Sequence, residues 1–271
     1  MKLHLQDLRR PAGTIAVLAA AAGLVLTGCG PSSGSGSNAS GAKSPASSGT
    51  SPSASSSGGS SGGSTSVTSS ASVPFPSTAG DSWKYKDSNG DTVVNKITSV
   101  TSVSAGQQVT MSTLIKSGSA AGTTNTAYYI VQPNGQISLP FSQFSTSGSG
   151  VTVKLISGTL FWPSASALAS GQSDHSTLKL KFTINGKTQK VTEHVTVKGE
   201  GTQSVTVPAG TYSATVVQMT EAEKFMGYNI DVVIRTWLAN GVGPVQSELT
   251  SVDGSTTNIV NKQELVSFHH G

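Results

Sequence analysis

The amino-acid sequence predicts a mainly β protein, with a single antiparallel curved sheet that forms a half-barrel or barrel-like domain. The first indication is compositional, since all fifteen aromatic residues lie from Phe75 onward, which places the folded domain at residues 74–271. The second is a series of about ten stretches, rich in Val, Ile and Thr, in which apolar and polar residues alternate. The third is that Gly, Asn, Asp and Pro clusters separate these stretches closely enough for antiparallel hairpins.

Residues 1–28 have the layout of a secretory signal peptide. Lys2, Arg9 and Arg10 form a basic start, and an uncharged run rich in Ala, Leu and Val follows from residue 12 to residue 26. That run is shorter than the roughly 20 apolar residues that a transmembrane helix needs, and no basic patch follows it. The segment is therefore predicted to direct export and to be removed, so the membrane anchor must lie elsewhere.

The signal ends in Leu26, Thr27 and Gly28, directly before Cys29, the only cysteine of the chain. This four-residue sequence resembles the bacterial lipobox, which implies that a diacylglycerol is added to the cysteine and that a peptidase then cuts before it. Acyl chains on Cys29 would anchor the protein, since each buried methylene contributes about 0.8 kcal/mol. The predicted location is the extracytoplasmic face of the cell membrane, or the outer membrane in an organism with two membranes. The alternative is an ordinary signal peptide with an incidental cysteine.

Residues 29–73 are predicted to form a disordered tether that begins at the lipidated cysteine. Serine fills 20 of the 44 positions from residue 30 to residue 73, and Lys43 is the one charged residue among them. A segment with so little apolar surface cannot offset the entropy lost in ordering its backbone. As a flexible coil it would span about 35 to 40 Å, which would lift the folded domain away from the bilayer.

Charge and cysteine content exclude two classes of protein. Removing Lys2, Arg9, Arg10 and Asp7 from the 17 basic and 13 acidic residues leaves 14 and 12, a net charge of +2 for the mature chain. Because that chain contains no basic run, no nucleic-acid partner is expected. Because it contains no second cysteine, the domain is expected to be stabilised by a hydrophobic core rather than by disulfides.

The predicted strands follow one another with short connections. Trp83 and Tyr85 alternate with charged residues up to a hairpin turn at residues 88–91. One short helix is expected at residues 164–169, and a charged connection at residues 221–224 is expected to separate two strands. Besides the hairpin treated next, the remaining strands are expected at residues 92–103, 109–115, 126–131, 205–207, 211–220, 228–238, 245–252 and 257–268.

The clearest hairpin spans residues 178–197, around the turn Asn185-Gly186. Pairing Ile184 with Lys187 across this two-residue turn places Leu180 opposite Val191, and the same alternation buries Val195 and Val197. Gln189 and Glu193 share that face, so the second strand is expected to be dry only in places. Water is expected to reach the opposite face, with Lys179, Lys181, Thr192, His194 and Lys198.

Two further segments carry a recurrent motif. Residues 205–212 read Val-Thr-Val-Pro-Ala-Gly-Thr-Tyr, and residues 237–245 read Trp-Leu-Ala-Asn-Gly-Val-Gly-Pro-Val. With the Gly-x-x-Trp-x-Tyr of residues 80–85, they resemble a family of uncharacterised bacterial exported proteins and lipoproteins with VPAGT[FY] and W-x-A-x-G-V-G-x-V motifs. The resemblance covers residues 74–251 and implies a curved β-sheet of the kind that carrier lipoproteins use to hold lipids. The motif residues suit packing and turns rather than catalysis: Trp83, Tyr85, Pro208, Gly210, Trp237, Gly241 and Gly243.

The sequence offers little evidence for a catalytic, cofactor or metal site. Ser176 and Lys179 fit the S-x-x-K spacing, but on an alternating strand they point to opposite faces. Glu221 and Glu223 are expected beside a turn and pair with no second carboxylate at a defined distance. The histidines show no metal-ligand spacing and are expected on the solvated surface: His175, His194, His269 and His270. No catalytic residue, no cofactor and no metal site is therefore predicted.

Three functions remain open at this point. The preferred one is a non-enzymatic binding or carrier module for an amphiphile such as a lipid or glycolipid, with apolar residues near loops lining its mouth: Phe141, Phe144, Phe161 and Trp162. The second is a structural or interaction protein of the envelope that displays loops to a wall polymer or to another protein. The third is an unrecognised hydrolase, which would need a cleft that gathers polar residues distant in sequence.

Overall fold

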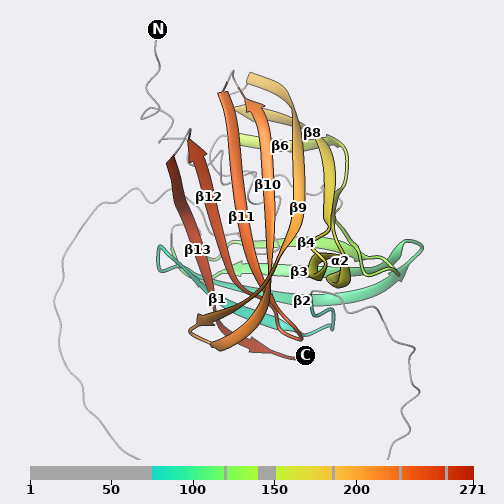
Figure 1. Ribbon diagram of the computed structural model, residues 1–271, viewed down its shortest axis with the longest axis vertical. Coiled ribbons are helices and arrows are strands. Elements are labelled where there is room, and N and C mark those ends of the chain that lie inside the picture. Colours follow the sequence, from blue (N-terminus) through green and yellow to red (C-terminus); the bar gives the residue numbers. More distant parts are fainter. Residues whose placement is uncertain (1–74, 119–120, 140–150, 185–186, 226–227, 254–255) are drawn as a thin grey trace, which may run out of the picture.

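The computed structural model describes residues 75–118, 121–139, 151–184, 187–225, 228–253 and 256–271. Within these ranges the chain forms thirteen strands, all in one antiparallel sheet, and one short helix (Figure 1). The predicted signal peptide, lipobox and tether lie outside the described residues, as do Phe141, Phe144 and the Asn185-Gly186 turn. The sequence prediction of a mainly β protein with a single curved antiparallel sheet is confirmed.

The first half of the described chain contains short and medium strands: β1 (Ser82–Asp87), β2 (Thr92–Val103), β3 (Gly106–Ile115), β4 (Thr124–Val131), β5 (Ile137–Leu139), β6 (Val151–Ser157) and β7 (Leu160–Trp162). After helix α2 (Ala165–Ala169), longer strands follow: β8 (Ser173–Ile184), β9 (Lys187–Val207), β10 (Gly210–Phe225), β11 (Tyr228–Ala239), β12 (Gly243–Asp253) and β13 (Thr256–His269). Their order across the sheet is β6-β8-β9-β10-β11-β12-β13-β1-β2-β3-β4-β5-β7.

The sheet curves around its own interior. Strands β8 to β13 stand side by side, and β1 to β4 run across their direction (Figure 1). The edge strands β6 and β7 do not pair with each other, yet the two ends of the sheet approach closely. The backbone N–H of Phe161 donates to Ser176 Oγ at 3.2 Å, and Gln136 Nε2 donates to Asp174 Oδ2 at 2.8 Å. The architecture is therefore a half-barrel whose two ends are linked by side-chain hydrogen bonds rather than by a ladder of backbone bonds.

The predicted hairpin around residues 185–186 has the expected register. Ile184 pairs with Lys187 and Leu180 lies opposite Val191, while Val195 and Val197 are buried. The predicted water-facing residues of both strands are exposed: Lys179, Lys181, Thr192, His194 and Lys198. The alternation of side chains, together with the turn residues, was therefore sufficient to predict this pairing.

Three predictions about the strands were wrong. Strand β9 is continuous over 21 residues, although the sequence favoured a break before residues 205–207. Strand β10 extends to Phe225, so the charged connection predicted at residues 221–224 is part of a strand. Glu193, expected at a partly wet position, is only 1% exposed. Strands β5, β6 and β7 were not predicted; β5 and β7 have only three residues each and are too short to show an alternating pattern.

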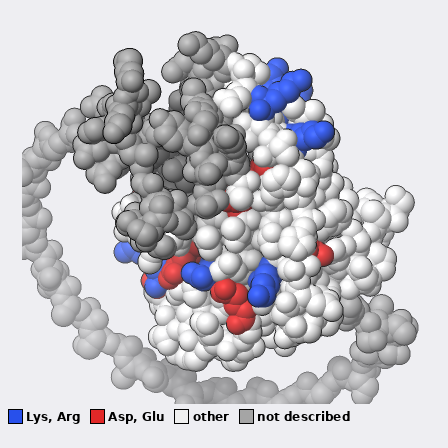
Figure 2. Space-filling model, turned by 45° about the horizontal axis from the view of Figure 1, so that its top comes forward, with Lys and Arg blue, Asp and Glu red and all other residues white. Residues whose placement is uncertain are grey.

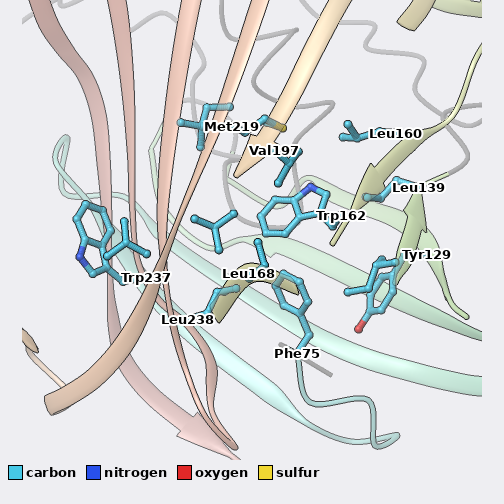
Figure 3. Close-up of a cluster of buried hydrophobic side chains, with 14 of the residues drawn as sticks. Phe75, Tyr129, Leu139, Leu160, Trp162, Leu168, Val197, Met219, Trp237 and Leu238 are labelled. Carbon is cyan, nitrogen blue, oxygen red and sulfur yellow. The ribbon is translucent and has the colours of Figure 1, made fainter. Parts of the chain in front are cut away.

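The core fills the interior where the two ends of the sheet meet. Phe75 lies against Trp162, with ring centroids 5.5 Å apart, and against Tyr129 at 6.3 Å (Figure 3). Leu139 and Leu160 extend this cluster from β5 and β7. Phe75, the first residue that the structure describes, is therefore already part of the core.

Helix α2 packs against the inner face of β9. The side chain of Ser164 caps its N-terminus, since Ser164 Oγ accepts from the backbone N–H of Ala167 at 3.3 Å. Leu168 on this helix is fully buried among the core residues (Figure 3). Gly199 on β9 permits the close approach, because a Cβ at that position would lie 1.9 Å from the carbonyl oxygen of Leu168. The helix predicted at residues 164–169 is confirmed.

Candidate functional site

The first and last pieces of the recurrent motif meet in space. The indole Nε1–H of Trp83 donates to the carbonyl oxygen of Val242 at 2.6 Å. The hydroxyl of Tyr85 donates to the carbonyl oxygen of Pro244 at 2.9 Å, and burial raises the pKa of Tyr85 well above its ordinary value. Both side chains of β1 therefore hold the turn between β11 and β12, 159 residues away in sequence.

Two of the motif glycines, Gly241 and Gly243, lie in the same turn. Gly243 has a φ of +84°, and a Cβ at this position would lie 2.8 Å from Cδ of Pro76. Both its backbone conformation and its surroundings therefore favour glycine over any larger residue. Gly241 lies on the exposed side of the turn, where a Cβ would meet no atom within 4 Å, and its φ of +73° is the feature that favours glycine there.

The middle piece of the motif forms the hairpin between β9 and β10, around Pro208 and Gly210. At its tip, the backbone N–H of Ala209 donates to the carbonyl oxygen of Leu265 on β13 at 3.0 Å. The hairpin thereby folds over the neighbouring strands.

Trp237 lies beneath this hairpin and donates from Nε1 to Gln203 Oε1 at 3.3 Å. Figure 3 shows its indole on the opposite side of β11 from Leu238, which faces the core. All the motif residues named from the sequence thus have positions that a role in packing or turn formation explains.

Replacing Tyr85 with phenylalanine tests this role. The free energy of unfolding of the Tyr85→Phe variant is expected to be about 1 to 2 kcal/mol lower, because the carbonyl oxygen of Pro244 loses the hydrogen bond from the Tyr85 hydroxyl. Tyr212→Phe is the control, since the half-buried Tyr212 hydroxyl donates only to Ala209, three residues earlier, at 3.3 Å. Urea unfolding of both variants provides the measurement, and equal losses would argue against a special role for the Tyr85 contact.

A second group of residues lies on the inward face of the sheet. Thr236 pairs with Ser247, Ser247 with Gln263, and Gln263 with Asp87, on the four adjacent strands β11, β12, β13 and β1. All four are buried. Ser247, Gln263 and Asp87 are each two residues from a core side chain on the same strand, namely Leu249, Leu265 and Tyr85, so they share its face. Thr236 is paired with Ser247 and therefore lies on the same face. We call these four side chains the inward polar row.

Several atoms of the inward polar row are unpaired. Within the part of the chain that the structure describes, Ser247 Oγ and both side-chain polar atoms of Gln263 have no hydrogen-bond partner, although both residues are fully buried. Asp87 Oδ1 accepts from the backbone N–H groups of Asn89 and Asp91 at 2.9 and 2.8 Å, whereas its Oδ2 is unpaired. Burial is the largest cause of a raised pKa for Asp87. Buried polar atoms normally have partners, so this row is suited to bind a polar group.

Two buried carboxyl groups lie farther along the inward face. Glu193 on β9 is opposite Leu178, and Glu221 on β10 is opposite Val195. Their exposed fractions are 1% and 3%, so Glu221 does not lie beside a turn as predicted from the sequence. Placing carboxyl groups among Leu and Val side chains gives the interior a second polar region.

Sequence reasoning missed the inward polar row, although its signal was present. Asp87 continues the alternation of Trp83 and Tyr85, and Gln263 precedes Leu265 by two residues. A polar residue at a position that alternation assigns to the core is informative, because buried polar groups are uncommon and need partners. Without the strand order, however, these positions could not be placed side by side.

The other candidates from the sequence are dispersed. Ser176 is buried and accepts a hydrogen bond from Phe161, whereas Lys179 is exposed on the opposite face, as the alternation predicted. The sequence suggests that Phe161 and Trp162 line the mouth of a binding site. Trp162 is instead buried in the core, and Phe161 is half-buried. The four histidines within the described ranges are exposed on the surface: His175, His194, His269 and His270.

Two kinds of feature are absent from the described ranges. No group of three His, Cys, Asp or Glu side chains there is arranged to hold a metal ion. Nor does any helix among those residues have the length and apolar character needed to cross a membrane.

Two bacterial proteins are among the solved structures that are similar to this chain. One is a protein of Parabacteroides distasonis named a "putative lipoprotein", with a TM-score of 0.53 and 19% identity over 73% of this chain and 99% of that one. The other is a "putative exported protein" of Bacteroides fragilis with a YmcC-like fold, with a TM-score of 0.50 and 18% identity over 72% of this chain and 98% of that one. At these identities the likeness shows a shared fold. None of the curated proteins compared matches the chain.

The family comparison extends over most of the folded domain. The match covers residues 78–257, from just before β1 to the beginning of β13, and so includes all three pieces of the recurrent motif. It spans more than half of the whole sequence. The chain therefore belongs to the DUF3108-like family.

Proposed function

We propose that this protein is a membrane-anchored lipoprotein of the cell envelope whose β domain binds an amphiphilic ligand and catalyses no reaction. The lipobox at residues 26–29 supports the anchor, and the words "putative lipoprotein" and "putative exported protein" for the two similar structures support export. Acylated Cys29 would hold the protein at the extracytoplasmic face of the membrane. The tether then places the half-barrel within reach of lipids and other envelope components.

The observation that carries the binding proposal is the inward polar row. An unpaired buried polar group destabilises a protein by about 1 to 3 kcal/mol, and the amide of Gln263 and the hydroxyl of Ser247 are both in that situation among the described residues. A ligand that offers hydrogen-bond donors and acceptors to these two side chains would remove that penalty. Selection for ligand binding therefore gives a reason for polar side chains at positions that alternation assigns to the core.

The neighbouring side chains suggest the ligand's overall chemistry. Toward the far end of the long strands, the inward polar row is followed by Ile234, Leu249 and Met219, all buried and apolar. A carboxamide and a hydroxyl can each donate and accept, which suits the hydroxyl groups of a sugar or glycerol. A lipid or glycolipid, with its headgroup at the row and its acyl part along the apolar residues, fits both features.

Native mass spectrometry provides the direct test. The chain from residue 30 onward, produced without its anchor, is exposed to an extract of the producing cell's envelope. A discrete added mass in the lipid range, removed by organic solvent, is the expected result. A protein that stays bare would overturn the carrier function and favour the competing one, an envelope interaction protein with wall-polymer or protein partners.

A substitution in the inward polar row tests where the ligand binds. Gln263→Leu is expected to weaken lipid binding by about tenfold or more, because each hydrogen bond lost to the headgroup contributes about 1 kcal/mol and the amide makes two. The same variant should unfold at equal or higher urea concentration, because it removes an unpaired buried amide.

Ser267→Ala is the matched control, since Ser267 lies on the same strand and is exposed. Binding and stability of this variant are expected to equal those of the unmodified chain. If Gln263→Leu bound lipid as well as the control did, the inward polar row would not be the headgroup site.

A further inference from the structure

Three lysines lie on one rung of the sheet, on its outward face. Lys154 on β6 is paired with Lys181 on β8, and Lys181 is paired with Lys190 on β9. All three side chains are exposed. Lys179 lies two residues from Lys181 on the same face, and Lys198 continues the series along β9. We call these five residues the lysine face.

This arrangement is unfavourable for the fold itself. Like charges directly opposite one another on adjacent strands are destabilising, and each of the three paired lysines faces at least one other. Among the described residues, the ion pairs involve Arg235, Lys262 and His270, and none includes a residue of the lysine face. Stability of the domain therefore does not explain why the lysines are gathered here.

Carboxylates are absent from the outward positions around the central rung. Between Ser173 and Lys181 on β8, and between Lys190 and Lys198 on β9, the outward positions carry only Lys, Thr, His and Ser. The nearest acid on the outward face of β9 is Glu200, and it accepts from Arg235 at 3.1 Å. In Figure 2, Lys and Arg side chains gather at the upper right, the side on which Figure 1 places β6 and β8, and no Asp or Glu side chain is visible between them. Although the mature chain is nearly neutral, this face is cationic.

The shape of the lysine face is elongated. From Lys190 to Lys198 it follows β9 for eight residues, or about 26 Å at the usual rise of a strand. The positions between the lysines hold groups that can form hydrogen bonds: Thr177, Thr192, His175 and His194. A long, narrow strip of ammonium groups, each a compact charge with three donors, matches repeated anionic groups along a chain better than one small anion.

We propose that the lysine face binds a linear polyanion of the cell envelope, a polymer that repeats phosphate or carboxylate groups along its length. A bilayer surface fits less well, because membrane-binding faces combine several aromatic and large apolar side chains. The outward positions of β8 and β9 have no aromatic residue, and Ile156, two residues from Lys154 on β6, is a single exposed apolar side chain beside the lysines. Single-stranded nucleic acid fits less well for the same reason, since bases stack on aromatic side chains. This inference is independent of the ligand in the interior, because the lysines lie on the opposite face of the sheet.

The test uses the complete chain in a nonionic detergent and two defined probes, long-chain inorganic polyphosphate and polygalacturonate. Binding of at least one probe is expected. If about three charges are neutralised, raising monovalent salt from about 50 to about 200 mM should weaken that binding roughly tenfold or more. Inorganic phosphate and neutral dextran should show no measurable binding, because neither presents repeated charges.

Variants locate the site. The triple substitution Lys154→Gln, Lys181→Gln and Lys190→Gln is expected to weaken polymer binding at least about tenfold and to reduce its salt dependence. Replacing the same three lysines with arginine should retain the binding. The control triple, Lys84→Gln, Lys86→Gln and Lys96→Gln, removes the same charge from exposed positions on β1 and β2, where Lys86 is paired with Glu264.

Each result has a definite consequence. If both glutamine triples lost the same polymer affinity, net charge alone would explain the effect and the proposal would be overturned. Polymer binding that the first triple leaves unchanged would overturn it as well. Unfolding in urea checks that the first triple is folded, and its stability should be equal or higher because like-charge contacts are removed. If anionic vesicles or single-stranded DNA bound through these lysines while both polymers did not, the partner would be a membrane or a nucleic acid instead.

Discussion

Replacing Gly199 with alanine is expected to destabilise the folded domain by about 3 kcal/mol or more. A Cβ at this position would lie 1.9 Å from the carbonyl oxygen of Leu168 and 2.7 Å from its carbonyl carbon. These are backbone atoms of α2, so no side-chain rotation relieves the contact. The helix would have to move away from β9, and Leu168, which is fully buried, would lose its packing in the core.

Gly201→Ala on the same strand is the matched control. Gly201 has a φ of +88°, but no atom lies within 4 Å of the position that its Cβ would take. Alanine there introduces only backbone strain, which destabilises by about 1 to 2 kcal/mol. Urea unfolding of the two variants separates the effects, and a Gly199→Ala variant no less stable than Gly201→Ala would show that α2 does not rest on this strand.

Most strands could be predicted from the sequence, because their alternation is regular and their turns carry characteristic residues. Strand β2 begins and ends where the sequence predicted, and β11 to β13 agree within two residues at each end. In these segments one face is buried and the other is wet, so the pattern of period two is clear. The same alternation, together with the turn residues, predicts the register of β8 against β9 that the structure has.

The long strands were harder to predict because their inward faces are not uniformly apolar. Glu193 and Glu221 occupy positions that alternation assigns to the core, and a carboxyl group there normally indicates a strand end or a turn. The break predicted between residues 197 and 205 includes Gly199, a position that the structure uses to admit α2 within one continuous strand. The strand prediction therefore failed at residues that lie on the inward face of the sheet: Glu193, Glu221 and Gly199.

The candidate sites could not be predicted for a different reason. The inward polar row and the lysine face each join strands that are distant or irregularly placed along the chain, such as β1 with β13 and β6 with β8. No sequence pattern specifies that order, because it depends on how the whole sheet curves. Alternation could assign Lys181 and Lys190 to the outward face, but only the pairing of β6 with β8 adds Lys154 to the same rung.

The largest effect on cellular location is expected from Cys29→Ala, applied to the complete chain. Without the thiol, no diacylglycerol can be attached through a thioether, and the peptidase that requires the lipidated cysteine should leave the signal uncleaved. The protein is then expected either to leave the membrane fraction or to remain there only as the longer, uncleaved form. Cell fractionation followed by intact-mass measurement distinguishes these products from a mature chain that begins at residue 29.

The comparison with Ser33→Ala makes this result specific, since Ser33 lies just beyond the cysteine in the predicted tether. That variant should be cleaved, acylated and retained as the unmodified chain is. A Cys29→Ala protein that kept both the mature size and its membrane attachment would rule out the lipid anchor. Binding of lipid by the β domain should survive Cys29→Ala, because the inward polar row begins at Asp87, well after the tether. Loss of anchoring and loss of ligand binding are therefore separable, and each half of the proposed function can fail without the other.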